Sequence, residues 1–339
     1  MQIRSSESVS RLNHYNCRVL SSINRVSAQP GETDGVQALA RRLHPSAGDA
    51  FHGTMIPALG VNPVGQSSKS KLRETRGHYD ANYNNFQTKL YEQVRRDAFG
   101  EDIGQNSWLT ASEQDTFQNW LRLTHGKRLL DVACGAGGPA LRLAALTGAT
   151  VVGIDVHEQA VATANALAAQ RGLERACEFR VLDATQPLPL ADGSFDAITC
   201  IDAINHLRER QHVIAAWAQL LKPEGRLLFT DPIVVTGPLT NAEIAIRSSA
   251  GFYLLVPQGY NEHVLAQCGL QLVATENLTQ NVADIAQRRM QARESQAQAL
   301  REIEGDLAFE AQQEFLAVSS ALAREGRLSR FLFVAEKLG

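Results

Sequence analysis

Short hydrophobic runs alternate with amphipathic segments along the chain from about residue 126 onward. The runs are rich in Leu, Val and Ile, which is typical of buried strands, and the segments between them carry apolar residues at helical spacing. The predicted strands are KRLLDVA (127–133), TVVGIDV (150–156), CEFRVLDA (177–184), SFDAITCID (194–202) and RLLFTDPIV (226–234). This alternation predicts an α/β domain on a doubly wound, Rossmann-like sheet of mainly parallel strands.

The pattern continues beyond the fifth strand with longer segments between the elements. A helix is expected at NEHVLAQCG (261–269), a strand at LQLVATENL (270–278) and a closing strand at SRFLFVAEK (329–337). Residues 284–324 are polar and helical in period, so they predict a helical insert before the last strand. A Pro-Gly turn, KPEG (222–225), is expected to precede the fifth strand.

Two segments with a helical apolar period precede the sheet and predict a helical N-terminal cap over residues 71–125. They are NNFQTKLYEQVRRDAFG (84–100) and SEQDTFQNWLRL (112–123), with Ser112 a weak capping residue before Asp115. Residues 1–70 have no sustained apolar period, and we expect a poorly structured extension there. A transit peptide, a tail without a fixed fold, and sequence upstream of a start at Met55 all fit this segment. The main domain is expected to span 126–339.

Composition excludes several kinds of partner. The chain has 339 residues, a net charge of −3 and a pI of about 6.3, without a basic stripe, so no nucleic-acid partner is expected. No apolar run approaches the roughly 20 residues that span a bilayer, so no membrane association is expected. The five cysteines are scattered, with no C-x-x-C and no zinc-like pairing with histidine. They indicate reduced thiols in a cytoplasmic protein and no metal site.

A glycine-rich turn follows the first predicted strand. The segment LLDVACGAGGPA (129–140) runs from a strand through the turn into a helix. Glycines allow backbone N–H groups to approach a ligand closely, and a helix N-terminus adds partial positive charge. Its Gly-Ala-Gly-x-x-Ala run also matches the dinucleotide fingerprint, so the turn alone does not identify the ligand.

Three acidic residues at successive strand ends narrow the choice. Asp131 precedes Gly135 by four residues, where a carboxylate would repel a pyrophosphate but suits an ammonium group and a sulfonium. Asp155 follows Gly135 by 20 residues, at the right distance to accept hydrogen bonds from two ribose hydroxyls. Asp183 closes the next strand and could receive an adenine amino group. A binding crevice at the strand ends explains all three better than three unrelated polar residues do.

This constellation resembles the class I S-adenosylmethionine-dependent methyltransferases over about 126–231. The D-x-G-x-G-x-G motif of that family appears as residues 131–137, with Ala133 at the first glycine. The family's D-x-S-F-D and L-K-P-G-G motifs appear as DGSFD (192–196) and LKPEG (221–225). The resemblance implies the seven-stranded methyltransferase sheet and S-adenosylmethionine as cofactor. It also implies these cofactor-binding residues: Asp131, Ala133, Cys134, Gly135, Ala136, Gly137, Asp155, Val156, Asp183, Ala184, Cys200, Ile201 and Asp202.

The segment CIDAINHL (200–207) stands at the end of the fourth strand, where open α/β sheets bind ligands. His206 is the candidate base, because an imidazole with a pKa near 6.5 suits proton transfer at neutral pH; a helix-start histidine bonded to the backbone is the alternative. DAINHL is similar to DAILHL of phosphoethanolamine N-methyltransferases and QDAILH of the glycine, sarcosine and dimethylglycine enzymes. In the phospho-base enzymes an N-terminal tyrosine pairs with this histidine, which makes Tyr79 or Tyr83 the candidate partner here.

The two segments 236–262 and 280–326 differ from these groups, and they are where acceptor specificity is expected. Asn205 stands where the similar families have an aliphatic residue. Arg247 could grip an anion, although a solvated or paired arginine is the commoner case. The sequence predicts a monomeric or homodimeric enzyme that methylates nitrogen or oxygen of a small-molecule acceptor.

Three other functions fit parts of the pattern. Methylation of carbon in a natural-product intermediate would use the same architecture. An NAD-dependent oxidoreductase would share the glycine turn, and Asp131 argues against it. A non-catalytic regulator could retain the fold, but the intact acidic residues at the strand ends argue against that reading.

Overall fold

The computed structural model describes Tyr79, residues 81–249 and residues 251–339. The expected N-terminal extension, 1–70, and residues 71–78 lie outside the described residues. Within the described part, no helix has both the length and the apolar character needed to cross a membrane.

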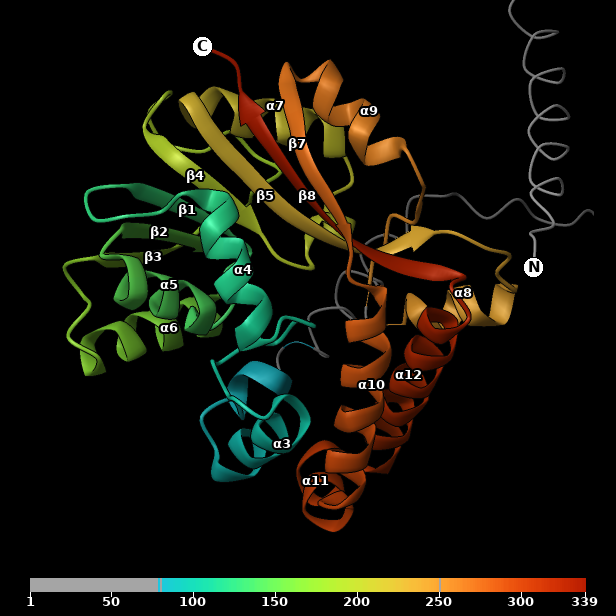
Figure 1. The fold of residues 1–339 in the computed structure, drawn as a ribbon. Helices are drawn as coiled ribbons and strands as arrows, with labels where there is room; N and C mark the ends of the chain where they lie inside the picture. The colour runs from blue at the N-terminus through green and yellow to red at the C-terminus, as the bar shows by residue number, and fades with distance from the viewer. Residues whose placement is uncertain (1–78, 80, 250) are drawn as a thin grey trace, which may run out of the picture. The chain divides into compact units, whose positions relative to one another are not determined.

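The centre of the domain is one eight-stranded sheet in the order β3-β2-β1-β4-β5-β8-β7, with β6 paired to β5 (Figure 1). Strands β1 to β6 pair in parallel, and β8 runs antiparallel to both β5 and β7. The bounds are β1 Arg128–Val132, β2 Thr150–Asp155, β3 Cys177–Val181, β4 Phe195–Cys200, β5 Leu221–Val235, β6 Val256–Pro257, β7 Leu270–Asn277 and β8 Leu328–Lys337. The doubly wound, Rossmann-like sheet is confirmed, with the two-residue β6 as an addition to the seven expected strands.

Alternate residues of the strands face two different hydrophobic layers, because successive side chains of a strand point to opposite faces. Leu129 belongs to the layer under α4, α5 and α6, whereas Leu130 belongs to the layer under α7 and α9. The bounds are α4 Ala111–Leu121, α5 Gly138–Thr147, α6 Glu158–Gln170, α7 Arg210–Leu220 and α9 Tyr260–Gln267. Both faces of the sheet are therefore covered, as a buried parallel sheet requires.

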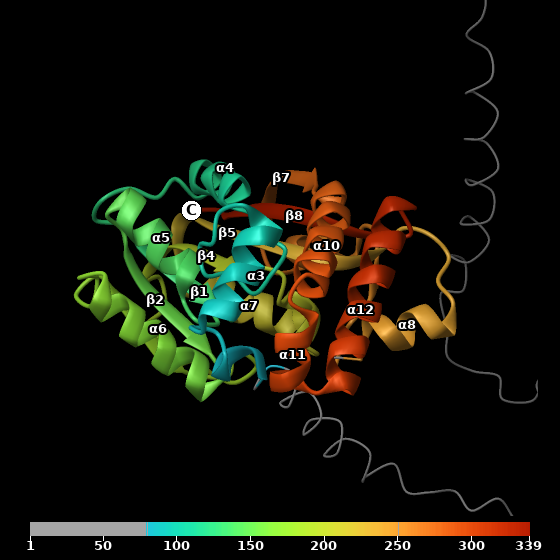
Figure 2. The ribbon, with the colours of Figure 1, turned by 90° about the horizontal axis from the view of Figure 1, so that it is seen from below.

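A helical bundle lies beyond the carboxyl ends of the parallel strands. It contains α10 Thr279–Glu294, α11 Ala297–Glu304 and α12 Asp306–Arg324, which connect β7 to β8, and α3 Lys89–Phe99 from the N-terminal side. Figure 2 shows α3 beside α10 and α11. Phe99, Trp108, Ile285 and Leu316 share one buried cluster of this bundle. The bundle contacts the sheet at the carboxyl end of β4, because the Trp108 backbone N–H donates to Asp202 just after β4 (2.9 Å).

Two local expectations were wrong in detail. The cap of α4 is Thr110, whose hydroxyl accepts from the Glu113 backbone N–H while the Glu113 side chain returns to Thr110; Ser112 lies inside the helix. The expected turn at 222–225 lies within β5 as an irregularity, where the register jumps from Phe195–Leu221 to Ala197–Arg226. The left-handed φ of Glu224 (62°) makes this bend.

Candidate active site

The glycine turn after β1 has the backbone conformation that glycine favours. Ala133, Gly135 and Gly137 all have left-handed φ values, of 57°, 55° and 76°. A Cβ on Gly137 would lie 2.8 Å from the Ala164 Cβ and 2.9 Å from the Phe179 ring, so only glycine fits there. Ala133 adopts the same conformation with a side chain, at a cost of about 1–2 kcal/mol. The left-handed backbone of these residues therefore keeps the turn open. Ala133 is strained at the position where the similar family motif has glycine.

Two of the predicted carboxylates are tied into this turn. Asp131 lies opposite Thr199 in the register of β1 and β4, and its Oδ1 accepts from the Thr199 hydroxyl at 2.7 Å. Asp155, at the end of β2, accepts from the Gly135 backbone N–H and from the His157 backbone N–H, both at 2.9 Å. Burial raises the pKa of both carboxyls, that of Asp131 to about 7. Asp131 is thereby bonded to β4, and Asp155 to the glycine turn and to the start of α6.

The third carboxylate stands farther into solvent. Asp183 is exposed two residues after the end of β3, and its Oδ1 accepts from the Thr185 backbone N–H at 2.9 Å. Ala184 follows it and is partly buried. Val156, directly after Asp155, is 62% exposed, an unusual state for a valine at a strand end. These residues form an open rim along β2 and β3 rather than a closed site.

Tyr83 lies over the glycine turn. A Cβ built on Gly135 would be 2.7 Å from the Tyr83 hydroxyl, so the phenol occupies the space directly above that residue. Its ring also lies 4.7 Å from that of His157, centroid to centroid. His157 caps α6, because its side chain accepts from the Ala160 backbone N–H. The two candidate tyrosines therefore lie at different places. Tyr83 contacts the glycine turn and is not the partner of His206.

Tyr79 is the tyrosine that meets His206. Its hydroxyl lies 3.2 Å from Nε2 of His206, at the end of the short 3-10 helix η2, Ile204–His206. Nδ1 of His206 lies 3.0 Å from the carbonyl oxygen of Phe252. A carbonyl only accepts, so we assign the proton of the neutral ring to Nδ1, which leaves Nε2 as the acceptor for the Tyr79 hydroxyl. Burial, with a contribution from Arg247, lowers the pKa of His206 below its usual value.

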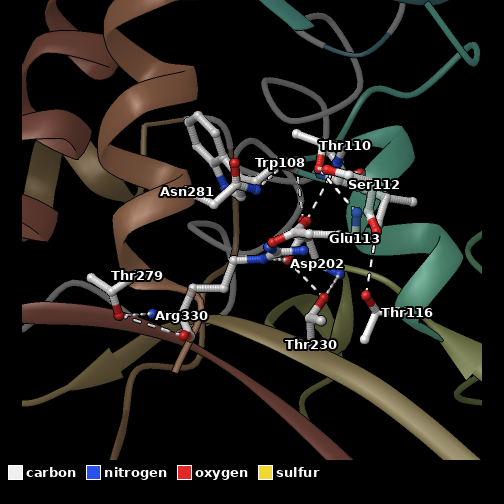
Figure 3. A network of polar contacts seen from close by, with 12 residues as sticks. Trp108, Thr110, Ser112, Glu113, Thr116, Asp202, Thr230, Thr279, Asn281 and Arg330 are labelled. Carbon is white, nitrogen blue, oxygen red and sulfur yellow. Dashed lines mark hydrogen bonds and ion pairs between the residues drawn. The ribbon is translucent and has the colours of Figure 1, made fainter. Parts of the chain in front are cut away.

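Asp202 is held by the protein itself, as Figure 3 shows. Its carboxylate accepts from Nε of Arg330 at 2.7 Å and from the Thr230 hydroxyl at 2.7 Å. Arg330, fully buried on β8, also forms a two-pronged ion pair with Glu113 of α4, at 2.8 and 3.0 Å. The Asp202 side chain is only 3% exposed. Its place beside the cofactor stays a prediction; in the structure the carboxylate bonds Thr230 of β5 and Arg330 of β8, and Arg330 links it to α4.

A second buried ion pair supports the same edge from behind. Arg210, the first residue of α7, donates to Asp231 at 2.6 Å and to Asn261 at 2.7 Å, and Asn261 also donates to Asp231. All three residues are buried. This cluster fixes the start of α7 and of α9 against β5. Because η2 precedes α7 by a few residues, it also limits the movement of His206.

A pocket of about 70 Å³ lies next to the Tyr79–His206 pair. Its walls come from the N-terminal segment, η2, α8 (Asn241–Arg247), α10 and α12, and they include Tyr79, Asn205, His206, Arg247, Tyr253 and Arg289. In the part of the chain that the structure describes, no group of three or more His, Cys, Asp or Glu side chains is arranged to hold a metal ion.

Comparison with known proteins decides the family. A family described as "Methyltransferase domain" matches residues 130–229. The 27-O-demethylrifamycin SV methyltransferase of Amycolatopsis mediterranei is 30% identical over 54% of this chain and 71% of its own length. The methyltransferase GfsG of Streptomyces halstedii is 33% identical over 60% of this chain and 73% of its own. The chain belongs to the class I S-adenosylmethionine-dependent methyltransferases.

A solved structure supports the fold of this methyltransferase. Phosphoethanolamine N-methyltransferase 2 of Haemonchus contortus, solved with S-adenosylhomocysteine, superposes with a TM-score of 0.65 at 20% identity. The match covers 77% of this chain and 60% of the nematode chain. Other relatives of this methyltransferase are named as O-, C- and N-methyltransferases, so the comparisons leave the acceptor atom open.

The residues of the glycine turn fit S-adenosylmethionine chemically. The ligand carries an ammonium group and two ribose hydroxyls, which require acceptors; Asp131 supplies a buried carboxylate and Asp155 a partly buried one beside the turn. Cys134 and Cys200 are buried free thiols with pKa values raised by burial, so they act as small apolar residues at this edge.

Sequence reasoning did not single out Trp108 and Arg289 of the pocket wall, or Arg330, which lies outside the pocket and holds Asp202. The signal for Arg330 was present, because an arginine in the otherwise apolar strand SRFLFV demands a buried partner. Trp108 and Arg289 gave no such signal. They come from a loop and from a polar helix, and the fold alone brings them to the pocket.

Proposed function

We propose that this methyltransferase transfers the methyl group of S-adenosylmethionine to a nitrogen or oxygen of a small molecule bound in the pocket beside His206. The contact between Tyr79 and Nε2 of His206 carries this proposal, because it places a polarised hydroxyl and a neutral imidazole where an acceptor would lie. Methyl transfer to an O–H or N–H group requires loss of a proton, and a neutral imidazole can accept one.

The proposed cofactor contacts follow the geometry of the turn. Asp131 accepts from the ammonium group, the backbone of Ala133 to Gly137 borders the methionine portion, and Asp155 accepts from the ribose hydroxyls. The exposed Val156 and the pair Asp183 and Ala184 border the adenine, Val156 by apolar contact and Asp183 through its free acceptor oxygen. When bound, S-adenosylmethionine supplies an electrophilic methyl group on sulfonium.

The proposed role of His206 depends on its fixed tautomer. The Phe252 carbonyl holds the Nδ1 proton, so Nε2 faces Tyr79 and the pocket. The lowered pKa keeps the ring neutral near pH 7. The Tyr79 hydroxyl also hydrogen-bonds the Tyr253 side chain, and burial keeps its own pKa well above the usual value. We therefore assign Tyr79 to orient the acceptor and to relay its proton: the O–H proton of Tyr79 moves to Nε2 of His206, and the phenol oxygen takes the proton that the acceptor loses.

Methylation of carbon is the weaker alternative. The aromatic rings of Tyr79, Trp108, Tyr253 and Phe315 around the pocket would suit a carbocation, which favours that chemistry. Arg247 and Arg289 face the same space, and their positive charges would repel such an intermediate. The charge of the pocket thus favours transfer to nitrogen or oxygen.

A screen with S-adenosylmethionine against amines, phenols and alcohols tests this proposal. Formation of S-adenosylhomocysteine is measured, and the site of the new methyl group is read by mass spectrometry with a labelled donor. We expect conversion of at least one acceptor, with the label on nitrogen or oxygen. A label on carbon would contradict the assignment of the acceptor atom.

The proposed enzyme acts in the cytoplasm as a monomer or homodimer, without nucleic acid or membrane.

A further inference from the structure

Two arginines face the acceptor pocket without a carboxylate partner among the described residues. Arg247, at the end of α8, is 3% exposed, and its Nη1 has no hydrogen-bond partner in the described part of the chain. Its guanidinium lies 4.5 Å above the Phe315 ring. Arg289 of α10 lies 5.5 Å from the Trp108 ring. A buried guanidinium that stacks on a ring still has its N–H donors unpaired, which is costly in a low dielectric.

The groups around the two arginines do not supply the missing negative charge. Asp202 is the acidic residue of the pocket wall, and it already pairs with Arg330. Burial raises the pKa values of Tyr79 and Tyr253, so both phenols stay neutral. Burial and the nearby Arg293 lower the pKa of Arg289 to about 10, which keeps it cationic at neutral pH. Among the described residues, the pocket therefore holds two positive charges without a carboxylate partner.

Asn205 adds an independent sign of a missing ligand. Its side chain is 99% buried in the pocket wall, and neither its Oδ1 nor its Nδ2 has a hydrogen-bond partner in the described structure. A buried amide without partners costs about 1–3 kcal/mol. The similar families noted above have an aliphatic residue here, which would avoid that cost. An occupant with oxygen acceptors would satisfy the amide N–H and the guanidinium together.

We propose that the methyl acceptor carries an oxyanion, a carboxylate or a phosphate, that Arg247 and Arg289 bind beside Asn205. This inference rests on the proposed function, since it names the acceptor class of the same pocket. The anion is the handle that orients the acceptor, and its nucleophilic nitrogen or oxygen points toward Tyr79 and His206. Planar guanidinium groups bind oxyanions through paired N–H donors, which gives geometric specificity as well as charge.

Anion binding is tested without turnover on the full chain loaded with S-adenosylhomocysteine. The thermal midpoint is measured with inorganic phosphate, with acetate and with chloride at equal ionic strength. We expect phosphate or acetate, added at about ten times its dissociation constant, to raise the midpoint by about 2–4 °C over chloride. The better of the two identifies the class of oxyanion. The matched control is Arg208→Gln, since Arg208 is exposed and stacks on Phe252 nearby without lining the pocket.

The shift should disappear in Arg247→Gln and Arg289→Gln and persist in Arg247→Lys and Arg208→Gln. An equal shift in wild type and both glutamine variants would overturn the inference, as would no shift in wild type with either anion. If Arg247→Gln fails to fold, the Arg289→Gln and Arg289→Lys pair decides. If the glutamine variants lose the shift but no acceptor is ever methylated, the anion site is supported and the proposed function is refuted. If uncharged acceptors are methylated and no anion binds, the proposed function is supported and the anion site is refuted.

Discussion

The Tyr79 hydroxyl lies 3.2 Å from Nε2 of His206, although 127 residues separate them in the chain. The contact joins the N-terminal segment to the tip of β4, so it closes the pocket on one side and aims the imidazole on the other. The contact also explains the positions of both residues, since neither polar side chain is expected in a hydrophobic core. The predictions below depend on this contact and on the groups that hold it in place.

Tyr79→Phe removes the hydroxyl and keeps the ring. We expect kcat to fall about tenfold, because one hydrogen bond to the acceptor or to Nε2 is worth about 1–1.5 kcal/mol. The dissociation constant for S-adenosylmethionine should stay within a factor of three. The control is Tyr91→Phe, which removes a hydroxyl that donates to Glu304 in the bundle, and it should leave kcat unchanged. Steady-state kinetics on both variants check this, and equal losses would assign the effect to stability.

Asp155→Ala removes a carboxylate that holds the glycine turn and, in the proposal, the ribose. We expect affinity for S-adenosylmethionine to fall by about 1–3 kcal/mol through lost hydrogen bonds. Isothermal titration calorimetry measures it, with Asp192→Ala as the control because Asp192 is exposed in a loop away from the turn. An unchanged dissociation constant in Asp155→Ala would remove Asp155 from the cofactor site.

The raised pKa of Asp131 predicts that a proton is released when S-adenosylmethionine binds. Burial raises its pKa from 3.8 to about 7, so the folded carboxyl holds a proton that the unfolded chain loses above about pH 4. Its stabilising contribution is full below about pH 4 and is lost as the pH rises through about 7. A bound ammonium favours the carboxylate, so binding near pH 6.5 should release more than about half a proton.

Calorimetry in buffers of different ionisation enthalpy measures this release directly. Asp131→Asn keeps the shape of the side chain and cannot titrate, so it should release no proton at the same pH. The same release in wild type and variant would show that another group titrates, and the ammonium would then lie elsewhere.

The strand ends could be predicted from the sequence, and the pocket walls could not. Asp131 and Asp155 follow periodic apolar runs, so the topology of a parallel sheet places them at one edge. The sequence leaves two tyrosines as candidate partners of His206, because hydrophobic periodicity does not show which residue of a distant segment meets it in the fold. Only the fold separates Tyr79, at His206, from Tyr83, at Gly135.

The buried charges show the same limit. The sequence predicts that Asp202 faces a ligand, because it gives the position of this residue along the chain and not the partner of its carboxylate. Its partner Arg330 lies 128 residues away on a strand that runs antiparallel to β5, and Glu113 comes from a third element. Charges that pair across such separations appear only when the elements are packed.

Arg330→Met tests this network as a support of the site. Removing one partner of a buried pair should cost about 3–5 kcal/mol of unfolding free energy, because Asp202 and Glu113 remain buried and uncompensated. Urea denaturation measures the loss. Arg301→Met is the comparison, since Arg301 forms its ion pairs at the surface and its loss should leave the midpoint nearly unchanged. A similar small effect for both would show that the network does not hold β8 to the tip of β4.

The rate of methyl transfer in a single turnover of His206→Asn is the most direct measurement. Asparagine keeps an amide near the position of Nδ1, where it can still bond the Phe252 carbonyl, and cannot accept the acceptor proton at neutral pH. With S-adenosylmethionine bound and an acceptor from the screen in excess, the rate should fall about 10²- to 10⁴-fold, with cofactor affinity within threefold of wild type. A fall of less than threefold would contradict proton transfer to His206 and leave that residue a structural member of the pocket wall.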